Sequence, residues 1–397
     1  MRQRASWSSA ILATSCAVLL LASCGGGGNG PGEANALRTS AEVLQPGPAG
    51  VGVTTVTFED ASRPTMANGR FAGSPTRKLV TEIWYPTDPD PTGSRMDIRD
   101  APVAQNGRPY PLVIYSHGFM STRLGGTFLT RHLASYGYIV AAPDFPLTNS
   151  SAPGGANVLD LANQPGDVSF LIDQLLALSA DVDSRFAGAV DRQRIGLTGL
   201  SLGGSTTFLT AFHPTLRDPR VRAAAPIAGG ACFFGKDFYA DTSVPLLILH
   251  GDIDAIVPYV ENAVFAFAEA NPPKYLVTIL GGSHTGFADG IELLVENQNN
   301  PDDLGCRALG GNSAADSGAS FLERLGGPAV GIIMGECPLP CAGPRPLPRS
   351  IRPTRQHDLT LLSIFPFFEA TLRDNRSARR FLEETLAAEN PDVTIAF

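Results

Sequence analysis

The 397-residue sequence has no excess of positive charge, since 30 lysines and arginines stand against 38 aspartates and glutamates and the formal net charge is −8. A surface with this balance gives no reason to expect nucleic acid as a partner. The sequence also lacks an internal repeat, and no second cysteine or histidine pair lies at the spacing of a zinc site. These absences argue against a nucleic-acid-binding protein, a repeat protein and a zinc-stabilised fold.

A hydrophobic run long enough to span a bilayer is missing at the N-terminus. The largely apolar residues 10–22 follow Arg2 and Arg4 and are followed by small residues. A stretch of this length is too short to cross a membrane comfortably, and the layout is that of a secretory signal. We therefore expect residues 1–23 to be a signal peptide.

The end of this signal resembles a bacterial lipoprotein box, because residues 21–24 read Leu-Ala-Ser-Cys and four glycines follow Cys24. We expect Cys24 to carry a lipid anchor, residues 24–50 to be a flexible linker, and the protein to be exported to the bacterial cell envelope. This anchor would be its only membrane contact. The alternative is an ordinary cleaved signal, an incidental Cys24 and a periplasmic or secreted protein.

Two cysteines lie in or next to the signal, which leaves four in the remainder of the chain. An even number in an oxidising compartment predicts two disulfides. Four cysteines allow three pairings, and spacing does not choose among them. Because a Pro-Leu-Pro separates Cys337 from Cys341, we favour pairing each of these two with either Cys232 or Cys306.

From residue 51 to the C-terminus we expect one α/β domain. Short apolar runs near 50–58, 79–85, 111–115, 138–142, 194–198, 221–227, 245–250 and 275–280 predict strands. Helical patterns lie near 125–136, 168–178, 205–213, 260–270, 359–372 and 378–387, and Asp167 is placed to cap the second of these helices. This alternation predicts a mainly parallel sheet with helices on both faces. Residues 288–353 lose the pattern, and we expect an irregular excursion, held by disulfides, that acts as a cap.

The residues Gly-Leu-Ser-Leu-Gly at 199–203 lie between a predicted strand and a predicted helix. In this context a Gly-x-Ser-x-Gly serine sits on a strained turn with its hydroxyl exposed at the end of a sheet. Glycines at 199 and 203 remove side chains that would collide there. The motif predicts that Ser201 is a nucleophile.

A serine nucleophile needs a base, and the base needs an orienting carboxylate. His284 lies in a loop just past a predicted strand, whereas the other histidines lie within helices or next to other elements. Asp252 and Asp254 both follow the preceding strand; we favour Asp254 and expect Asp252 to brace the turn. Ser201, Asp254 and His284 then occur in the chain order expected for this kind of sheet.

Two backbone amides are expected to bind the developing oxyanion. One is the amide of Leu202, directly after the nucleophile, and the other is that of Phe119, which follows the third main strand. We expect His117 to bond the loop rather than to carry a proton.

These segments resemble a known family. The residues 111–119, 136–138, 167–178, 199–204, 251–258 and 283–284 are similar to bacterial relatives of platelet-activating-factor acetylhydrolase, often described as predicted dienelactone hydrolases. The resemblance covers about residues 50–290 and implies the α/β-hydrolase fold. Dienelactone hydrolases use a cysteine nucleophile, so Ser201 favours ordinary carboxylic esters over lactones. The same catalytic layout, including an aromatic residue after Gly118, is also similar to that of cutinase-like polyester hydrolases.

From these patterns we expect an exported serine esterase that hydrolyses short acyl or lipid esters through an acyl-enzyme. No metal or cofactor is required for this chemistry, and the expected partner is an ester substrate. The alternatives are a cutinase-like polyester hydrolase and a catalytically inactive hydrolase fold that serves as a binding lipoprotein.

Overall fold

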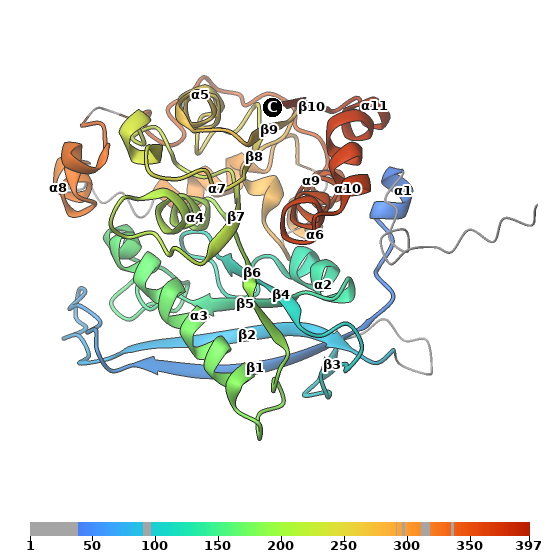
Figure 1. Cartoon of the computed structure of the whole chain (residues 1–397). Helices are drawn as coiled ribbons and strands as arrows, with labels where there is room; N and C mark the ends of the chain where they lie inside the picture. Colours follow the sequence, from blue (N-terminus) through green and yellow to red (C-terminus); the bar gives the residue numbers. More distant parts are fainter. Residues whose placement is uncertain (1–38, 90–96, 291, 296–297, 311–317, 335–336) are drawn as a thin grey trace, which may run out of the picture. The chain divides into compact units, whose positions relative to one another are not determined.

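A ten-stranded sheet forms the centre of the protein (Figure 1). The computed structural model describes residues 39–397 except 90–96, 291, 296–297, 311–317 and 335–336. The strands are β1 (Gly50–Asp60), β2 (Arg77–Thr87), β3 (Ile98–Arg99), β4 (Tyr110–Ser116), β5 (Ile139–Asp144), β6 (Val190–Leu200), β7 (Val221–Ile227), β8 (Leu246–Gly251), β9 (Lys274–Ile279) and β10 (Val393–Ala396).

The order of the strands is β10-β9-β8-β7-β6-β4-β5-β2-β1-β3. The six strands from β9 to β5 in this order run parallel to one another, whereas β2, β1 and β10 each pair antiparallel with a neighbour. The predicted mainly parallel sheet is therefore confirmed. Because β6, β8 and β9 are parallel, their carboxyl ends lie at the same edge, which is where ligands bind in open α/β sheets.

Helices cover both faces of the sheet. The α-helices are α1 (Ser40–Val43), α2 (Thr127–Ser135), α3 (Gln164–Ala180), α4 (Leu202–Phe212), α5 (Phe265–Glu269), α6 (Glu292–Val295), α7 (Asp302–Gly310), α8 (Gly318–Arg324), α9 (Pro353–Leu372), α10 (Arg376–Arg380) and α11 (Leu386–Glu389). Short 3₁₀ or π segments are η1 (Val158–Asn163), η2 (Lys236–Tyr239), η3 (Val260–Val264), η4 (Thr285–Phe287), η5 (Gly327–Val330) and η6 (Phe381–Thr385). None of the described helices is long and apolar enough to cross a membrane.

The strand β4 shows why its sequence is continuously apolar. Leu112 and Ile114 point into one buried cluster, which also contains side chains of α3 and α4. Val113 and Tyr115 point into a second buried cluster, with side chains of α2 and α9. In Figure 1, α3 and α4 accordingly lie on one side of the central strands and α2 and α9 on the other. Because both faces of such a strand are buried, apolar residues stand at successive positions and not only at alternate ones.

The first described residues pack onto the fold, in contrast to the predicted linker over 24–50. The helix α1 contacts α9, and Val43 is fully buried. Thr39 and Glu42 form a capping box at its start, with each side chain accepting a hydrogen bond from the other residue's backbone amide. The prediction of a flexible linker is therefore wrong for residues 39–50, and residues 1–38, with the signal peptide and Cys24, lie outside the described part of the chain.

Asp167 does not cap the helix after it. The helix α3 begins at Gln164, three residues earlier than the predicted cap, with Pro165 in its first turn. The Asp167 carboxylate is completely buried and accepts hydrogen bonds from Arg77 Nε at 2.7 Å and Nη2 at 2.6 Å. This bidentate pair joins α3 to β2, and its buried charges explain why an aspartate stands there.

The excursion over 288–353 is more regular than predicted, since it contains α6, α7 and α8. Two disulfides hold it. Cys232, after β7, pairs with Cys337, and Cys306 in α7 pairs with Cys341. Both predicted disulfides are confirmed, in the favoured kind of pairing. On the chain-entropy model, loops of 105 and 35 residues each contribute about 3–5 kcal/mol to stability. That the excursion acts as a cap stays a prediction.

Candidate active site

Ser201 lies on a sharp turn between β6 and α4. Its backbone has φ 58° and ψ −116°, a left-handed conformation that is strained for a residue with a side chain. A Cβ atom at Gly203 would lie 1.9 Å from the carbonyl oxygen of Ser116, and one at Gly199 would lie 2.5 Å from the same oxygen. The two glycines of the motif therefore let the turn press against the end of β4, which leaves the Ser201 side chain half-buried at the sheet edge.

Asp254 and His284 are in direct contact. The His284 Nδ1 lies 2.7 Å from Asp254 Oδ2, and both side chains are buried. A carboxylate can only accept, so Nδ1 carries the hydrogen and Nε2 is left as a base. Burial lowers the pKa of His284, but the Asp254 charge and hydrogen bond outweigh it, so the pKa of His284 is raised overall.

Both oxygens of the Asp254 carboxylate accept hydrogen bonds. Its Oδ1 accepts from the amides of Ile256 at 2.9 Å and Val257 at 2.7 Å. Burial alone would raise the pKa of Asp254, but His284 and the hydrogen bonds from two histidines hold it well below its usual range. Asp254 is therefore ionised and fixed in one orientation.

The second histidine on Asp254 is His250, which lies near the end of β8. His250 Nε2 lies 2.8 Å from the Val257 carbonyl oxygen and 3.3 Å from Asp254 Oδ2. Both are acceptors, so Nε2 carries the hydrogen, and the buried Nδ1 has no partner in the described part of the chain. The four-residue spacing from His250 to Asp254 across a turn is the signal that places the two together.

Asp252, the alternative acid, does not reach His284. It is exposed, and its Oδ1 accepts a hydrogen bond from the Gly281 amide at 2.6 Å. Asp252 thus braces the loop after β8 against the loop after β9.

The loop after β4 brings Phe119 and Leu202 to the same turn. A Cβ atom at Gly118 would lie 3.5 Å from Ser201 Cβ. Leu202 is the first residue of α4, where backbone amides have no partner within the helix. Within the described residues, neither its amide nor that of Phe119 donates to a protein acceptor. The loop that carries Phe119 therefore lies against the turn of Ser201, and both N–H groups lack a protein partner among the described residues.

His117 is fully buried and fixes this loop. Its Nδ1 donates to the Gly118 carbonyl oxygen at 2.8 Å, and its Nε2 accepts from the Phe145 amide at 3.1 Å. Burial lowers the pKa of His117 and keeps it neutral. The side chain bonds the loop, as we expected.

The remaining histidines make structural contacts. His132 packs against Phe365, His357 stacks on Phe128 with ring centroids 4.0 Å apart, and His213 Nε2 donates to the Leu325 carbonyl oxygen.

The Ser201 hydroxyl makes no hydrogen bond to any described residue. His284 is therefore hydrogen-bonded to Asp254 but not to Ser201. Ser201, Asp254 and His284 all follow strands that end at one edge of the sheet.

The chain is similar to several known proteins. A family model described as PETase, PET hydrolase-like, matches residues 102–295, slightly less than half of the chain. A putative carboxymethylenebutenolidase of Yersinia pestis is 26% identical over 47% of this chain and 72% of its own length. Cutinase est1 of Thermobifida alba is 24% identical over 44% of this chain and 60% of its own length.

A solved structure, the ferulic acid esterase from Streptomyces cinnamoneus, shares the fold over 89% of this chain and 99% of its own, with a TM-score of 0.60 and 23% identity. The chain therefore has the α/β-hydrolase fold and is similar to PET hydrolase-like and dienelactone-hydrolase-like proteins, and these similarities support ester hydrolysis as its reaction.

Proposed function

We propose that the protein is a serine esterase in which Ser201 attacks the ester carbonyl carbon. His284 Nε2 takes the hydroxyl proton as the bond from Ser201 Oγ to carbon forms, and returns it to the alcohol oxygen as the ester bond breaks. A water molecule then attacks the acyl-enzyme in the same way, which releases the carboxylic acid and restores Ser201. Each step conserves protons, so no cofactor enters the scheme.

The observation that carries this proposal is the 2.7 Å contact from His284 Nδ1 to Asp254 Oδ2 at the sheet edge that also bears the strained Ser201. Asp254 holds the imidazole in the tautomer that leaves Nε2 basic and stabilises the imidazolium that forms. The amides of Phe119 and Leu202 would donate to the oxyanion. Each such donor typically contributes about 3 kcal/mol to the transition state.

Carboxylic esters with short acyl or lipid chains are the proposed substrates. Exposed apolar side chains, Met120 and Leu124, follow the oxyanion loop and favour an apolar ester group. The similarity to PET hydrolase-like proteins and to cutinases supports a polyester as the second candidate. The finer likeness to platelet-activating-factor acetylhydrolase relatives is part of the proposal for lipid esters.

A substrate series tests this function. We expect turnover of p-nitrophenyl butyrate, with kcat/KM falling at least about tenfold toward the palmitate ester if the pocket takes short acyl groups. Phosphatidylcholine dispersions and polyester films, measured by released acid, identify the lipid and polymer alternatives. A fluorophosphonate probe should label Ser201. If the probe does not label Ser201 and no ester is hydrolysed, the inactive binding lipoprotein is favoured instead.

We further propose that the protein is exported and anchored by a lipid on Cys24. The two disulfides support export, because such bonds persist in oxidising compartments. Arg2, Arg4 and the apolar residues 10–22 before Cys24 support a signal peptide.

Replacement of Cys24 by alanine tests the anchor. We expect the Cys24→Ala protein to leave the membrane fraction of expressing cells, whereas the unaltered protein sediments with it. Mass spectrometry of the N-terminal peptide shows the acyl groups directly. An unmodified N-terminus in the original protein would favour an ordinary cleaved signal.

A further inference from the structure

A second buried aspartate, Asp302, lies beside the proposed catalytic pair. It is the first residue of α7 and is completely buried. Its Oδ2 accepts hydrogen bonds from the amides of Ala255 at 2.9 Å and His284 at 3.1 Å, and its Oδ1 accepts one from the Thr285 amide at 2.6 Å. One carboxylate thus bonds the loop after β8 and the loop after β9.

These three amides belong to the residues that set the geometry of the site. Ala255 directly follows Asp254, and His284 is itself the proposed base. The distance between the two catalytic side chains depends on how their loops are placed against each other, and Asp302 bonds both loops within one side chain.

Asp302 has no ion-pair partner among the described residues. Burial raises the pKa of Asp302, and the charge of Asp254 raises it further, whereas His284 and the amides oppose this shift. An aspartate buried beside another carboxylate is unfavourable unless its hydrogen bonds compensate. The hydrogen bonds from the three amides therefore compensate the burial of the Asp302 carboxylate.

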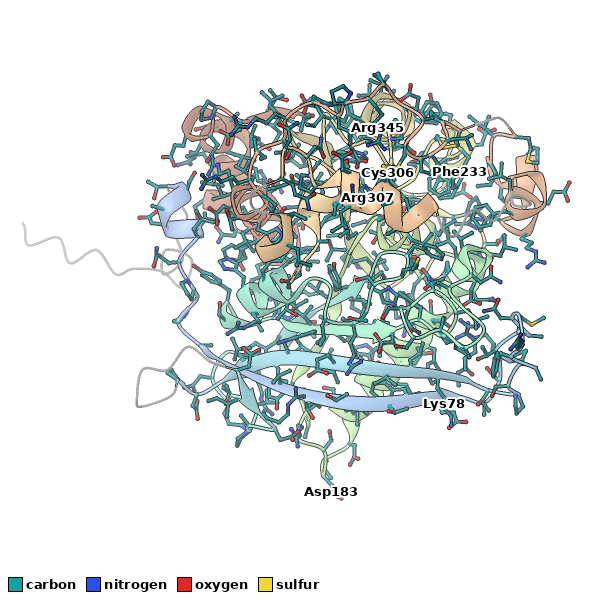
Figure 2. All side chains as sticks on the ribbon, turned by 180° about the vertical axis from the view of Figure 1, so that it is seen from behind. Lys78, Asp183, Phe233, Cys306, Arg307 and Arg345 are labelled. Carbon is teal, nitrogen blue, oxygen red and sulfur yellow. A yellow bond between two sulfur atoms is a disulfide. The ribbon has the colours of Figure 1, made fainter. Side chains whose placement is uncertain are left out.

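The helix that carries Asp302 is fixed to the same loops by two further contacts. The Cys306–Cys341 disulfide leaves α7 one turn after Asp302, and the Cys341 amide donates to the Ala255 carbonyl oxygen at 2.7 Å. A Cβ atom at Gly305 would lie 2.4 Å from Thr285 Oγ1, so α7 packs directly on the base loop. Figure 2 labels Cys306 and Arg307 on this helix.

We propose that Asp302 is a positioning residue for the esterase site: its carboxylate ties the loop of Asp254 to the loop of His284 and so sets the separation of acid and base. This inference rests on the proposed function. Asp302 donates no proton and touches no substrate; it acts through the two loops.

The variant Asp302→Asn tests it. Asparagine has the same shape but turns an NH₂ group toward backbone N–H donors, so the loops should separate slightly. Because a displacement of about 1 Å can cost about 100-fold in rate, we expect kcat to fall about 10- to 100-fold with KM within about twofold.

The pH profile supplies a readout that a purely structural role would not move. The charged groups that act on His284 are Asp254 after β8 and Asp302 on α7, whereas His357 of the packed helix α9 is turned to the Ala288 carbonyl oxygen. The Asp302 charge raises the pKa of His284, and only the neutral imidazole acts as a base. Removing the Asp302 charge should therefore lower the pKa of His284 and move the acid limb of the pH profile of kcat/KM to lower pH.

Asp303→Asn is the matched control, since Asp303 is the next residue of α7, half-exposed, and paired with Arg345 rather than with the loops. We expect its kcat and acid limb to equal those of the original protein. The Asp302→Glu variant restores the charge and should return the acid limb to its original position while recovering part of kcat. A folded Asp302→Asn enzyme with kcat within twofold of the original and an unmoved acid limb overturns the proposal.

Should Asp302→Asn not fold, Asp302→Glu decides alone: a folded protein with kcat reduced tenfold or more supports positioning, and an unchanged kcat with lowered thermal stability refutes it. These outcomes are separate from the proposed function, because fluorophosphonate labelling of Ser201 and ester turnover in the unaltered protein establish that function whatever Asp302 does.

Discussion

Replacing Ser201 by alanine is expected to lower ester turnover by about 10⁴-fold or more, because no other group would form the acyl-enzyme. The fold should remain, since the Ser201 hydroxyl makes no hydrogen bond to the described residues and alanine fits the same space. Initial rates with p-nitrophenyl butyrate measure the loss, and circular dichroism with a thermal melt checks the fold.

Ser205 provides the matched control. It lies one turn into α4, is buried, and donates its hydroxyl hydrogen to the Gly230 carbonyl oxygen at 2.9 Å. We expect Ser205→Ala to cost about 1 kcal/mol of stability while keeping most of the turnover and the probe labelling. More than a few per cent of the original rate in Ser201→Ala would remove Ser201 from the mechanism.

Asp254→Asn is expected to lower kcat by about 10³- to 10⁴-fold with little change in KM. The amide is neutral, so it no longer stabilises an imidazolium at His284. It also presents an NH₂ group to one pair of its present donors, either the two histidines or the amides of Ile256 and Val257. The pH dependence of kcat/KM should show a lower pKa for His284, because the charge that raises it is gone.

Asp252→Asn is the comparison variant from the same loop. The Asp252 side chain is exposed and bonds only the Gly281 amide among the described residues, and an asparagine oxygen can still accept that hydrogen bond. We expect kcat within about threefold of the original. If Asp252→Asn lost as much activity as Asp254→Asn, the acid would be wrongly assigned.

Much of the fold could be predicted because the residues within each strand or helix carry the pattern that is typical of it. The buried strands of the sheet are apolar on both faces, so β4 and β8 stand out as continuous apolar runs. The strands β3 and β10 were missed because they are short and lie at the two edges of the sheet, where apolar residues are not required. The start of α1 carried a readable signal, since Thr39 and Glu42 have the spacing of a capping box.

The site was only partly predictable for a different reason. Ser201 and Asp254 follow strands and obey the order of the sheet, so their places can be inferred from the sequence. Asp302 lies in a segment rich in Gly, Asn and Pro, and its role depends on contacts with Ala255 and Thr285, which are 47 and 17 residues away along the chain. No pattern around Asp302 announces such contacts, because they form only when α7 packs on the finished sheet.

The backbone hydrogen bonds of Ala255 limit how the excursion over 288–353 can be shortened. Both its N–H and its C=O are taken by the excursion, through Asp302 and Cys341. Long surface insertions are usually the first parts removed to obtain a smaller catalyst, and here that deletion would strip the support from the residue next to the acid. Any shortening of this excursion therefore has to keep both attachment points, the Asp302 carboxylate and the Cys341 amide.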